Sequence, residues 1–264
     1  MADTVAAQQG HDLGADLELG LELADLADSL SRRWWRDPSL TVRRKADGTP
    51  VTPADGLVEE ALRIRLATAR PGDAVLGEEQ GLSGPFGTRR TWVVDPIDGA
   101  THFARGRTGF ATLLALLSDG VPVVGIVSMP GQGMRWWGAV GLAADSTHGP
   151  LHVSAMPSLA EASVAYSVPI DRTPRLRGLD AATAELYPVA DVSLFCDVAE
   201  GRADAAVAAD GAVWGLAAPY ALVTAAGGVC TDLSGAARAD GGSLVVAGPA
   251  LHPQVVRAIG ATMP

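Results

Sequence analysis

The chain contains little cysteine, almost no lysine and no long apolar run. Its two cysteines, Cys196 and Cys230, lie far apart in 264 residues, and neither belongs to a C-x-x-C pair. This spacing excludes a disulfide scaffold and a cysteine zinc site, so we expect two reduced thiols in a cytoplasmic protein. The first residues lack the basic and apolar segments of a signal peptide, and the apolar stretches are shorter than a membrane span.

Positive charge is also scarce. Lys45 is the single lysine, and the formal net charge at pH 7 is −10. Proteins that bind nucleic acid or anionic lipid carry clustered lysine and arginine, so we expect neither partner and a small-molecule substrate instead. With 48% hydrophobic and 19% charged residues, the chain can bury a substantial core.

The first half shows helix and strand patterns in turn. Apolar residues recur every three to four positions over residues 16–36, which predicts an amphipathic helix after a mobile tail of residues 1–15. Thr52 followed by Pro53 and Asp55 is typical of a helix start. Strands are expected at 91–94, 111–117, 121–128 and 135–140, with a loop over 95–99.

The second half alternates strands and helices. The expected elements are strands at 163–167, 205–209, 229–232 and 243–247, and helices at 193–201, 216–226 and 253–259. Alternation of this kind is typical of a layered α/β protein. We place the boundary between an N-terminal half (16–145) and a C-terminal half (146–264) in the loop-rich segment 141–150.

Three carboxylates follow predicted strands: one ends the short strand expected after the turn at residues 71–73, and two follow the strand at 91–94. Glu78 lies in a Gly-Glu-Glu element, and Asp95 and Asp98 belong to a D-P-I-D-G loop. Residues at strand ends can converge on a ligand, and clustered carboxylates repel one another unless a cation compensates them. Oxygen ligands without nearby His or Cys suit Mg²⁺. The pattern therefore predicts a magnesium site.

These motifs resemble those of the inositol monophosphatase superfamily, G-E-E, D-P-[IL]-D-G-T-x-N-F and W-D-x-A-A…E-A-G-G. They occur here at residues 77–79, 95–103, 214–218 and 225–228. Residues 70–79 and 135–137 most resemble the histidinol-phosphate phosphatases of this superfamily. The resemblance implies an αβαβα sandwich, a homodimer and Mg²⁺-dependent hydrolysis of a small phosphate monoester, such as a polyol or amino-alcohol phosphate.

The resemblance also implies roles for particular residues. Glu78, Asp95 and the carbonyl of Ile97 would hold the first ion, and Asp95 and Asp98 would hold a second together with the aspartate of W-D. Asp55 and the threonine of D-G-T would orient the attacking water. The turn of Gly99, Ala100 and Thr101 would contact the substrate.

Several of these positions depart from the family pattern. Ala100 replaces the D-G-T threonine, His102 replaces the asparagine, and Gly215 replaces the W-D aspartate. Ala208 stands where the family usually has a substrate-binding glutamate. Losing a metal ligand or a water-orienting group typically costs about 10²-fold in rate, so we expect an impaired second metal site.

Three functions remain open on this evidence. The first is a divergent phosphatase with fewer ions than the family norm. The second is a repurposed catalyst of proton transfer, elimination or cyclisation, in which Asp55 and the titratable His102 do the chemistry. The third is a non-catalytic relative.

Overall fold

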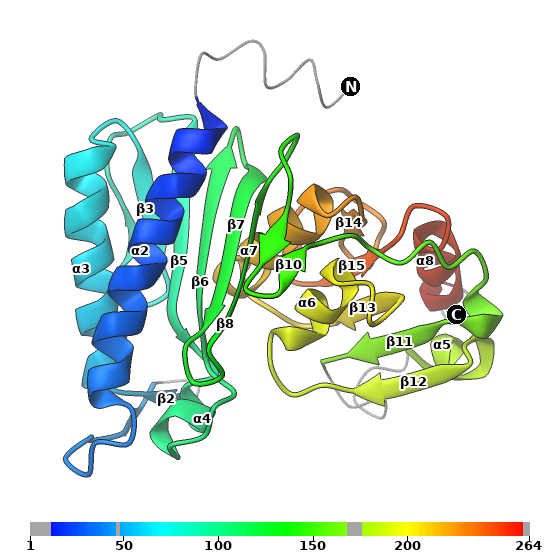
Figure 1. Cartoon of the computed structure of the whole chain (residues 1–264), viewed down its shortest axis with the longest axis horizontal. Coiled ribbons are helices and arrows are strands. Elements are labelled where there is room, and N and C mark those ends of the chain that lie inside the picture. Colours follow the sequence, from blue (N-terminus) through cyan, green and yellow to red (C-terminus); the bar gives the residue numbers. More distant parts are fainter. Residues whose placement is uncertain (1–11, 46–47, 168–175, 261–264) are drawn as a thin grey trace.

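The computed structural model of the chain describes residues 12–45, 48–167 and 176–260. Helices and sheets stack in the order helix, sheet, helix, sheet, helix (Figure 1). The expected αβαβα sandwich is therefore confirmed. Residues 1–11 of the expected tail lie outside the described residues. Among the helices that are described, none combines the length and apolar composition that crossing a membrane requires.

The first layer consists of helices α2 (Leu13–Trp34) and α3 (Pro53–Ala69). α2 starts three residues earlier than predicted, because the carboxylate of Asp12 caps it by accepting the backbone N–H groups of Gly14 and Ala15. α3 starts as predicted. The Thr52 side chain accepts a backbone N–H of the first turn, and the Asp55 carboxylate accepts the N–H of Thr52.

The second layer is an eight-stranded sheet. In spatial order its strands are β10 (Gly149–Pro150), β9 (Asp145–Ser146), β8 (Met134–Ala139), β7 (Val121–Met129), β6 (Ala111–Ser118), β5 (Arg90–Asp98), β3 (Ala74–Gly77) and β4 (Gly81–Ser83). Only β3 and β5 pair in parallel. β5 is longer than predicted: the segment expected as a loop continues the strand, with a register shift between Asp95 and Asp98.

The remaining layers are built from the second half of the chain. Helices α6 (Ser193–Ala199) and α7 (Val213–Ala225) separate the two sheets. The five-stranded sheet has the order β12 (Glu185–Pro188), β11 (Ser163–Tyr166), β13 (Ala205–Ala208), β15 (Leu244–Ala247) and β14 (Val229–Thr231). Helices α5 (Arg177–Ala182) and α8 (His252–Gly260) cover its outer face.

Short elements complete the fold. A hairpin of β1 (Arg43–Arg44) and β2 (Pro50–Val51) precedes α3, helix α4 (Ala100–Ala104) follows β5, and the 3₁₀ turn η1 (Leu159–Glu161) precedes β11. The elements that were not predicted from the sequence are β1, β2, β4, α4, β9, β10, η1, α5 and β12. Each spans six residues or fewer, which is too short for an apolar period to stand out.

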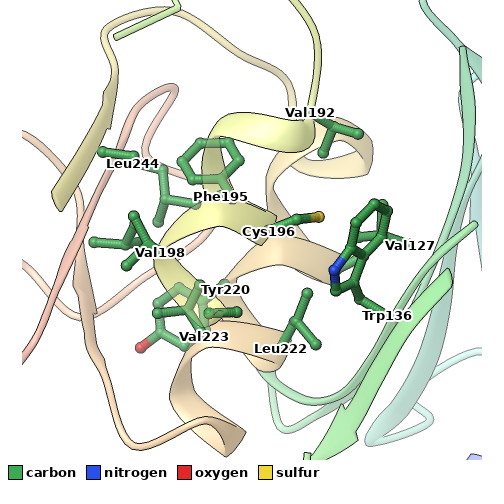
Figure 2. Close-up of a cluster of buried hydrophobic side chains, with 14 of the residues drawn as sticks. Val127, Trp136, Val192, Phe195, Cys196, Val198, Tyr220, Leu222, Val223 and Leu244 are labelled. Atoms are coloured by element: carbon green, nitrogen blue, oxygen red, sulfur yellow. The ribbon is translucent and has the colours of Figure 1, made fainter. Parts of the chain in front are cut away.

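The main core lies between the two sheets, around α6 and α7 (Figure 2). Phe195 and Val198 of α6 and Leu222 of α7 pack with Trp136 of the large sheet and Leu244 of the small one. Both cysteines are buried free thiols, as expected, and Cys196 belongs to this core. α7 lies so close to β7 that a Cβ on Gly125 would be 2.3 Å from the carbonyl oxygen of Ala218.

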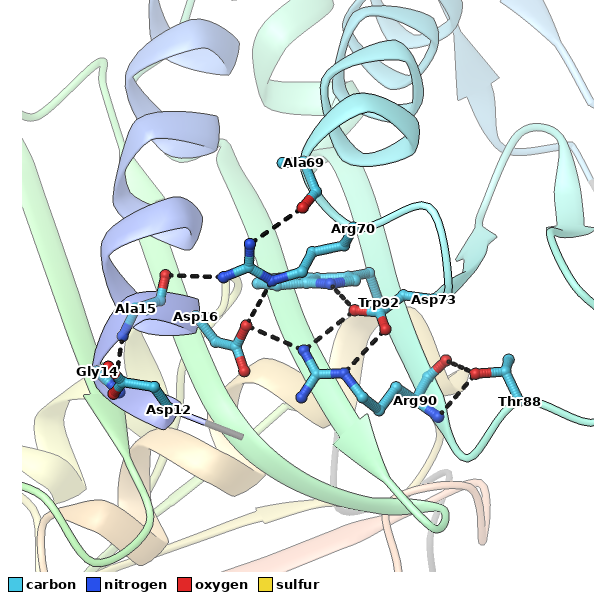
Figure 3. A network of polar contacts seen from close by, with 10 residues as sticks. All are labelled: Asp12, Gly14, Ala15, Asp16, Ala69, Arg70, Asp73, Thr88, Arg90 and Trp92. Atoms are coloured by element: carbon cyan, nitrogen blue, oxygen red, sulfur yellow. Dashed lines mark hydrogen bonds and ion pairs between the residues drawn. The ribbon is translucent and has the colours of Figure 1, made fainter. Parts of the chain in front are cut away.

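A buried ion-pair network joins the start of α2, the end of α3 and β5 (Figure 3). The Arg90 guanidinium donates to Asp16 and to Asp73 at 2.9 Å each. Arg70 donates to the same oxygen of Asp16, and the indole N–H of Trp92 donates to Asp73. Arg90 and Asp16 are almost fully buried, so this network holds the helical layer to the sheet.

Replacing Arg90 by Met should lower the free energy of unfolding by about 3 kcal/mol, because Asp16 and Asp73 stay buried after losing their shared partner. Urea denaturation measures the change. The matched control is Arg89→Met, because Arg89 is exposed and pairs with Asp119 at the surface. Equal loss in the two variants would contradict a role for the buried network.

Candidate active site

A cavity of about 390 Å³ lies where the ends of β3 and β5 face the starts of α6 and α7. Six of its described lining residues are acidic, and Lys45 is the one cationic side chain among them. The acids are Asp55, Glu78, Asp95, Asp98, Asp191 and Asp210. We call Asp55, Glu78, Asp95 and Asp98 the acid wall, since they all come from the N-terminal half.

Asp55 reaches the cavity from the first turn of α3. One of its oxygens accepts both the backbone N–H and the hydroxyl of Thr52, at 2.8 and 2.7 Å. The residue is 2% exposed. Burial, and to a smaller extent the charge of Glu78, raises the pKa of this carboxyl, while the bonds from Thr52 oppose that change.

Glu78 follows β3, where its backbone N–H donates to the carbonyl of Val94. The turn after Glu78 is fixed by Glu59 of α3. Glu59 is fully buried, and its carboxylate accepts the backbone N–H groups of Glu79 and Gln80 at 2.8 and 3.0 Å. A Cβ on Gly77 would lie 2.2 Å from the Glu59 carboxylate, so only glycine allows this approach.

Asp95 is also buried, at 4% exposure. Its Oδ1 atom is buried and has no hydrogen-bond partner among the described residues. Burial, followed by the charges of Asp98 and Glu78, raises the pKa of Asp95 well above its ordinary value. An unpartnered carboxylate oxygen of this kind fits a cation ligand.

Asp98 ends β5 beyond the register shift and is half-buried. Burial, followed by the charges of Glu78 and Asp191, raises its pKa to about 6. Asp191 precedes α6, where its carboxylate accepts the N–H of Ser193 at 3.0 Å. Two carboxylates from different halves of the chain thus line the same cavity.

Gly99 turns the chain from β5 into α4 with φ of 77°, in the left-handed region. A side chain there would also meet the carbonyl of Gly109 at 2.6 Å. Ile97, Gly99, Ala100 and Thr101 all line the cavity. The first backbone N–H groups of a helix lack partners within the helix, so this turn presents donors to an anion.

His102 belongs to an adjoining side pocket, not to the described lining of the cavity. The side pocket is formed by Arg36, His102, Gly106, Arg107, Thr108, Gly109, Gln132 and Asp191. A Cβ on Gly109 would lie 3.0 Å from both Nδ1 of His102 and Oδ2 of Asp191, so these groups flank one point. His102 and Asp55, the two groups named for the repurposed function, thus line different pockets.

The two altered positions of the second half also line the cavity. Ala208 ends β13, and Gly215 lies in the first turn of α7. A Cβ on Gly215 would have no neighbouring atom within 4 Å, so the cavity has room for a longer side chain at this position.

Lys45 was missed as a site residue by the sequence analysis. Its ammonium donates to Glu78 at 2.8 Å and to Glu79 at 2.5 Å. Burial alone would lower the pKa of Lys45, but these two bonds raise it above its ordinary value. Among the described residues, no three His, Cys, Asp or Glu side chains converge closely enough to hold a metal ion.

Asp191 was not predicted as a site residue either, although an aspartate two residues before a helix is a local signal in the sequence. The carboxylate oxygens of the acid wall and the unpartnered oxygen of Asp95 are hard donors suited to Mg²⁺. In the chemistry of their donor atoms, the residues present therefore fit such an ion.

Known proteins are similar to this chain in sequence and in structure. The sequence profile of the inositol monophosphatase family matches residues 17–263. A histidinol-phosphatase of Mycobacterium tuberculosis is 43% identical over 261 residues, covering 95% of this chain and 99% of that protein. An inositol-1-monophosphatase of Mycolicibacterium smegmatis, ImpA, is 32% identical over 83% of each chain. An inositol monophosphatase from Zymomonas mobilis is structurally similar, with a TM-score of 0.82, 30% identity and coverage of 95% and 99%.

The raised pKa of Asp98 predicts how pH affects stability. Between a pH of roughly 4 and 6, folded Asp98 binds a proton that the unfolded chain has released, so its contribution to stability falls as pH rises through this range. In EDTA, Asp98→Asn should therefore be more stable than the wild type at pH 7.5, by about 2 kcal/mol. This gain in stability is smaller than the rise in the pKa of Asp98 would give in a fully buried group, because water screens the half-buried carboxyl.

Urea denaturation at several pH values measures this difference, which should vanish near pH 4. The control is Asp37→Asn, because hydrogen bonds from Ser39 lower the pKa of the exposed Asp37 and no such gain is expected. A pH-independent difference for Asp98→Asn would contradict the electrostatic origin.

Proposed function

This chain belongs to the inositol monophosphatase family, and we propose that it hydrolyses a small phosphate monoester with the help of Mg²⁺. The observation that carries the proposal is the buried, unpartnered oxygen of Asp95, beside two further carboxylates on the cavity wall. Burying these acids together is unfavourable without a cation, and a divalent ion offsets that cost while providing chemistry.

Each member of the acid wall has a proposed role. Glu78, Asp95, Asp98 and the carbonyl of Ile97 would hold the ion. Bound there, Mg²⁺ would polarise the phosphate and lower the pKa of an attacking water. Asp55 would orient that water, since the bonds from Thr52 fix its position at the start of α3.

The phosphate would lie against the turn of Gly99, Ala100 and Thr101, whose backbone N–H groups can bind its oxygens. α7 also begins on the cavity, without a side-chain cap, so the positive end of its dipole favours the same anion. The loss of the family hydroxyl at Ala100 and of the carboxylate at Gly215 makes this a slow phosphatase with an impaired second ion site.

The opposite wall indicates the rest of the substrate. It is largely apolar, with Val192, Phe195 and Trp214 among its residues, and Asp191 stands among them as an acid. A carboxylate beside an apolar surface suits an organic group that carries an ammonium. Together with the 43% identity to a histidinol-phosphatase, this favours an amino-alcohol phosphate over a neutral polyol phosphate.

A panel of phosphate monoesters, with and without an amine, tests the function directly. Turnover should require Mg²⁺ and be lost in Glu78→Ala. Asp191→Asn should raise KM for amine-bearing esters by about tenfold or more, because it removes a charge-assisted contact, and leave KM for neutral polyol phosphates unchanged. The matched control is Asp210→Asn, an exposed acid of the same cavity. Release no faster than in Glu78→Ala for every ester would sink the proposal.

Restoring the family groups should increase the rate. Ala100→Thr combined with Gly215→Asp should raise kcat by at least about tenfold, since each returns a group that acts on the water or the second ion. There is space for the aspartate at Gly215. The pair Ala100→Thr with Gly215→Asn keeps the shape without the charge and should gain less. Equal rates for the two double variants would contradict an ion site at residue 215.

A further inference from the structure

Lys45 is the feature of the site that the proposed reaction does not use. Its ammonium is bonded to Glu78 and Glu79, and the side chains of all three are largely shielded from water, at 23%, 23% and 15% exposure. Lys45 is thus a cation that belongs to the chain and already occupies the acid cluster.

We propose that the Lys45 ammonium and the divalent ion are alternative partners of the Glu78 carboxylate, so that binding of the ion releases Lys45 from Glu78 into the cavity. This inference rests on the ion site of the proposed function. The Nζ atom lies 2.8 Å from Oε1 of Glu78, which is the distance of a direct charge-assisted hydrogen bond. An ion at that carboxylate would place two cations on one half-buried group, where their repulsion is strong.

The two glutamates are not equivalent in this exchange. The backbone of Glu79 is fixed by Glu59 beneath it, and Glu79 does not belong to the cavity lining. Glu78 does line the cavity and is the glutamate that faces Asp95 and Asp98. An ion therefore replaces the Lys45 ammonium at the Glu78 carboxylate, while the bond between the ammonium and Glu79 remains.

Release has a consequence for the reaction. Lys45 lines the same cavity as the turn that would hold the phosphate. Once the Lys45 ammonium has lost its bond to Glu78, one fewer carboxylate competes with an anionic ester for that ammonium. Lys45 thus keeps the charge of the ion-free acids balanced and becomes a positioning residue for substrate once the ion is bound.

Because Lys45 is the single lysine, the rate at which an amine-specific reagent modifies it reports whether its ammonium is paired. The full-length chain is treated with an N-hydroxysuccinimide ester of acetate, and acetylation of Lys45 is followed by mass spectrometry, with the α-amino group as the internal reference. The ion pair suppresses reaction, so saturating Mg²⁺ should increase the rate at Lys45 by about tenfold relative to NaCl of equal ionic strength. In Glu78→Gln the rate should be high already and should not respond to Mg²⁺.

Calorimetric titration of Mg²⁺ into the same preparations separates the possible results. Lys45→Gln should bind Mg²⁺ about tenfold more tightly than the wild type, because the competing cation is gone. The matched control is Arg44→Gln, which removes the same charge from the neighbouring residue, whose guanidinium bonds the carbonyl of Gly48 instead. Its affinity should equal that of the wild type.

Mg²⁺ binding without a change in acetylation, or equal affinities in Lys45→Gln and Arg44→Gln, would overturn the exchange and leave the phosphatase proposal standing. Absence of any Mg²⁺ binding would overturn both. Faster acetylation together with tighter binding in Lys45→Gln alone would support the exchange.

Discussion

The crowding of carboxylates on one cavity wall is the constraint on which the other features depend. β3 and β5 run in parallel, so Glu78 and Asp95 reach the same edge of the sheet, and the register shift in β5 brings Asp98 beside them. Burial and mutual repulsion raise the pKa of both aspartates, so the wall is costly in free energy unless a cation is present. The ammonium of Lys45 partly offsets this repulsion by pairing with Glu78, and the proposed divalent ion would offset more of it because its charge is higher.

Much of the fold could be predicted from the sequence, because its long elements have strong local signals. The apolar period of α2 and the capping box at Thr52 and Asp55 identify two helices within a few residues. The family motifs identify the layered architecture and the residues of the acid wall. Strand β5 was predicted too short, because proline and glycine suggest a loop while the pairing with β6 continues past Asp95 as a bulge.

The missed parts of the site depend on contacts between distant segments. Lys45 and Glu78 are 33 residues apart, and no local pattern relates them. Asp191 and Asp98 come from different halves of the chain, and their charges act on each other only once folding brings both to the same cavity. His102 shows the reverse: its chemistry and its place in the loop suggest a catalytic group, but the turn of α4 directs it to the side pocket. The roles of these residues, the identity of the ion and the homodimer stay predictions.

The way in which α3 supports the acid wall has a consequence for the effects of substitution. Asp55 and Glu59 lie one helical turn apart, and Glu59 holds the turn that presents Glu78. The acid wall and the helix that supports it therefore form one unit, in which a substitution disturbs several groups at once. Asp191 and Val192 lie at the start of α6, and Ala208 ends β13. The shape and charge of that part of the cavity can therefore change one residue at a time, while α3 and the acids that it supports keep their positions.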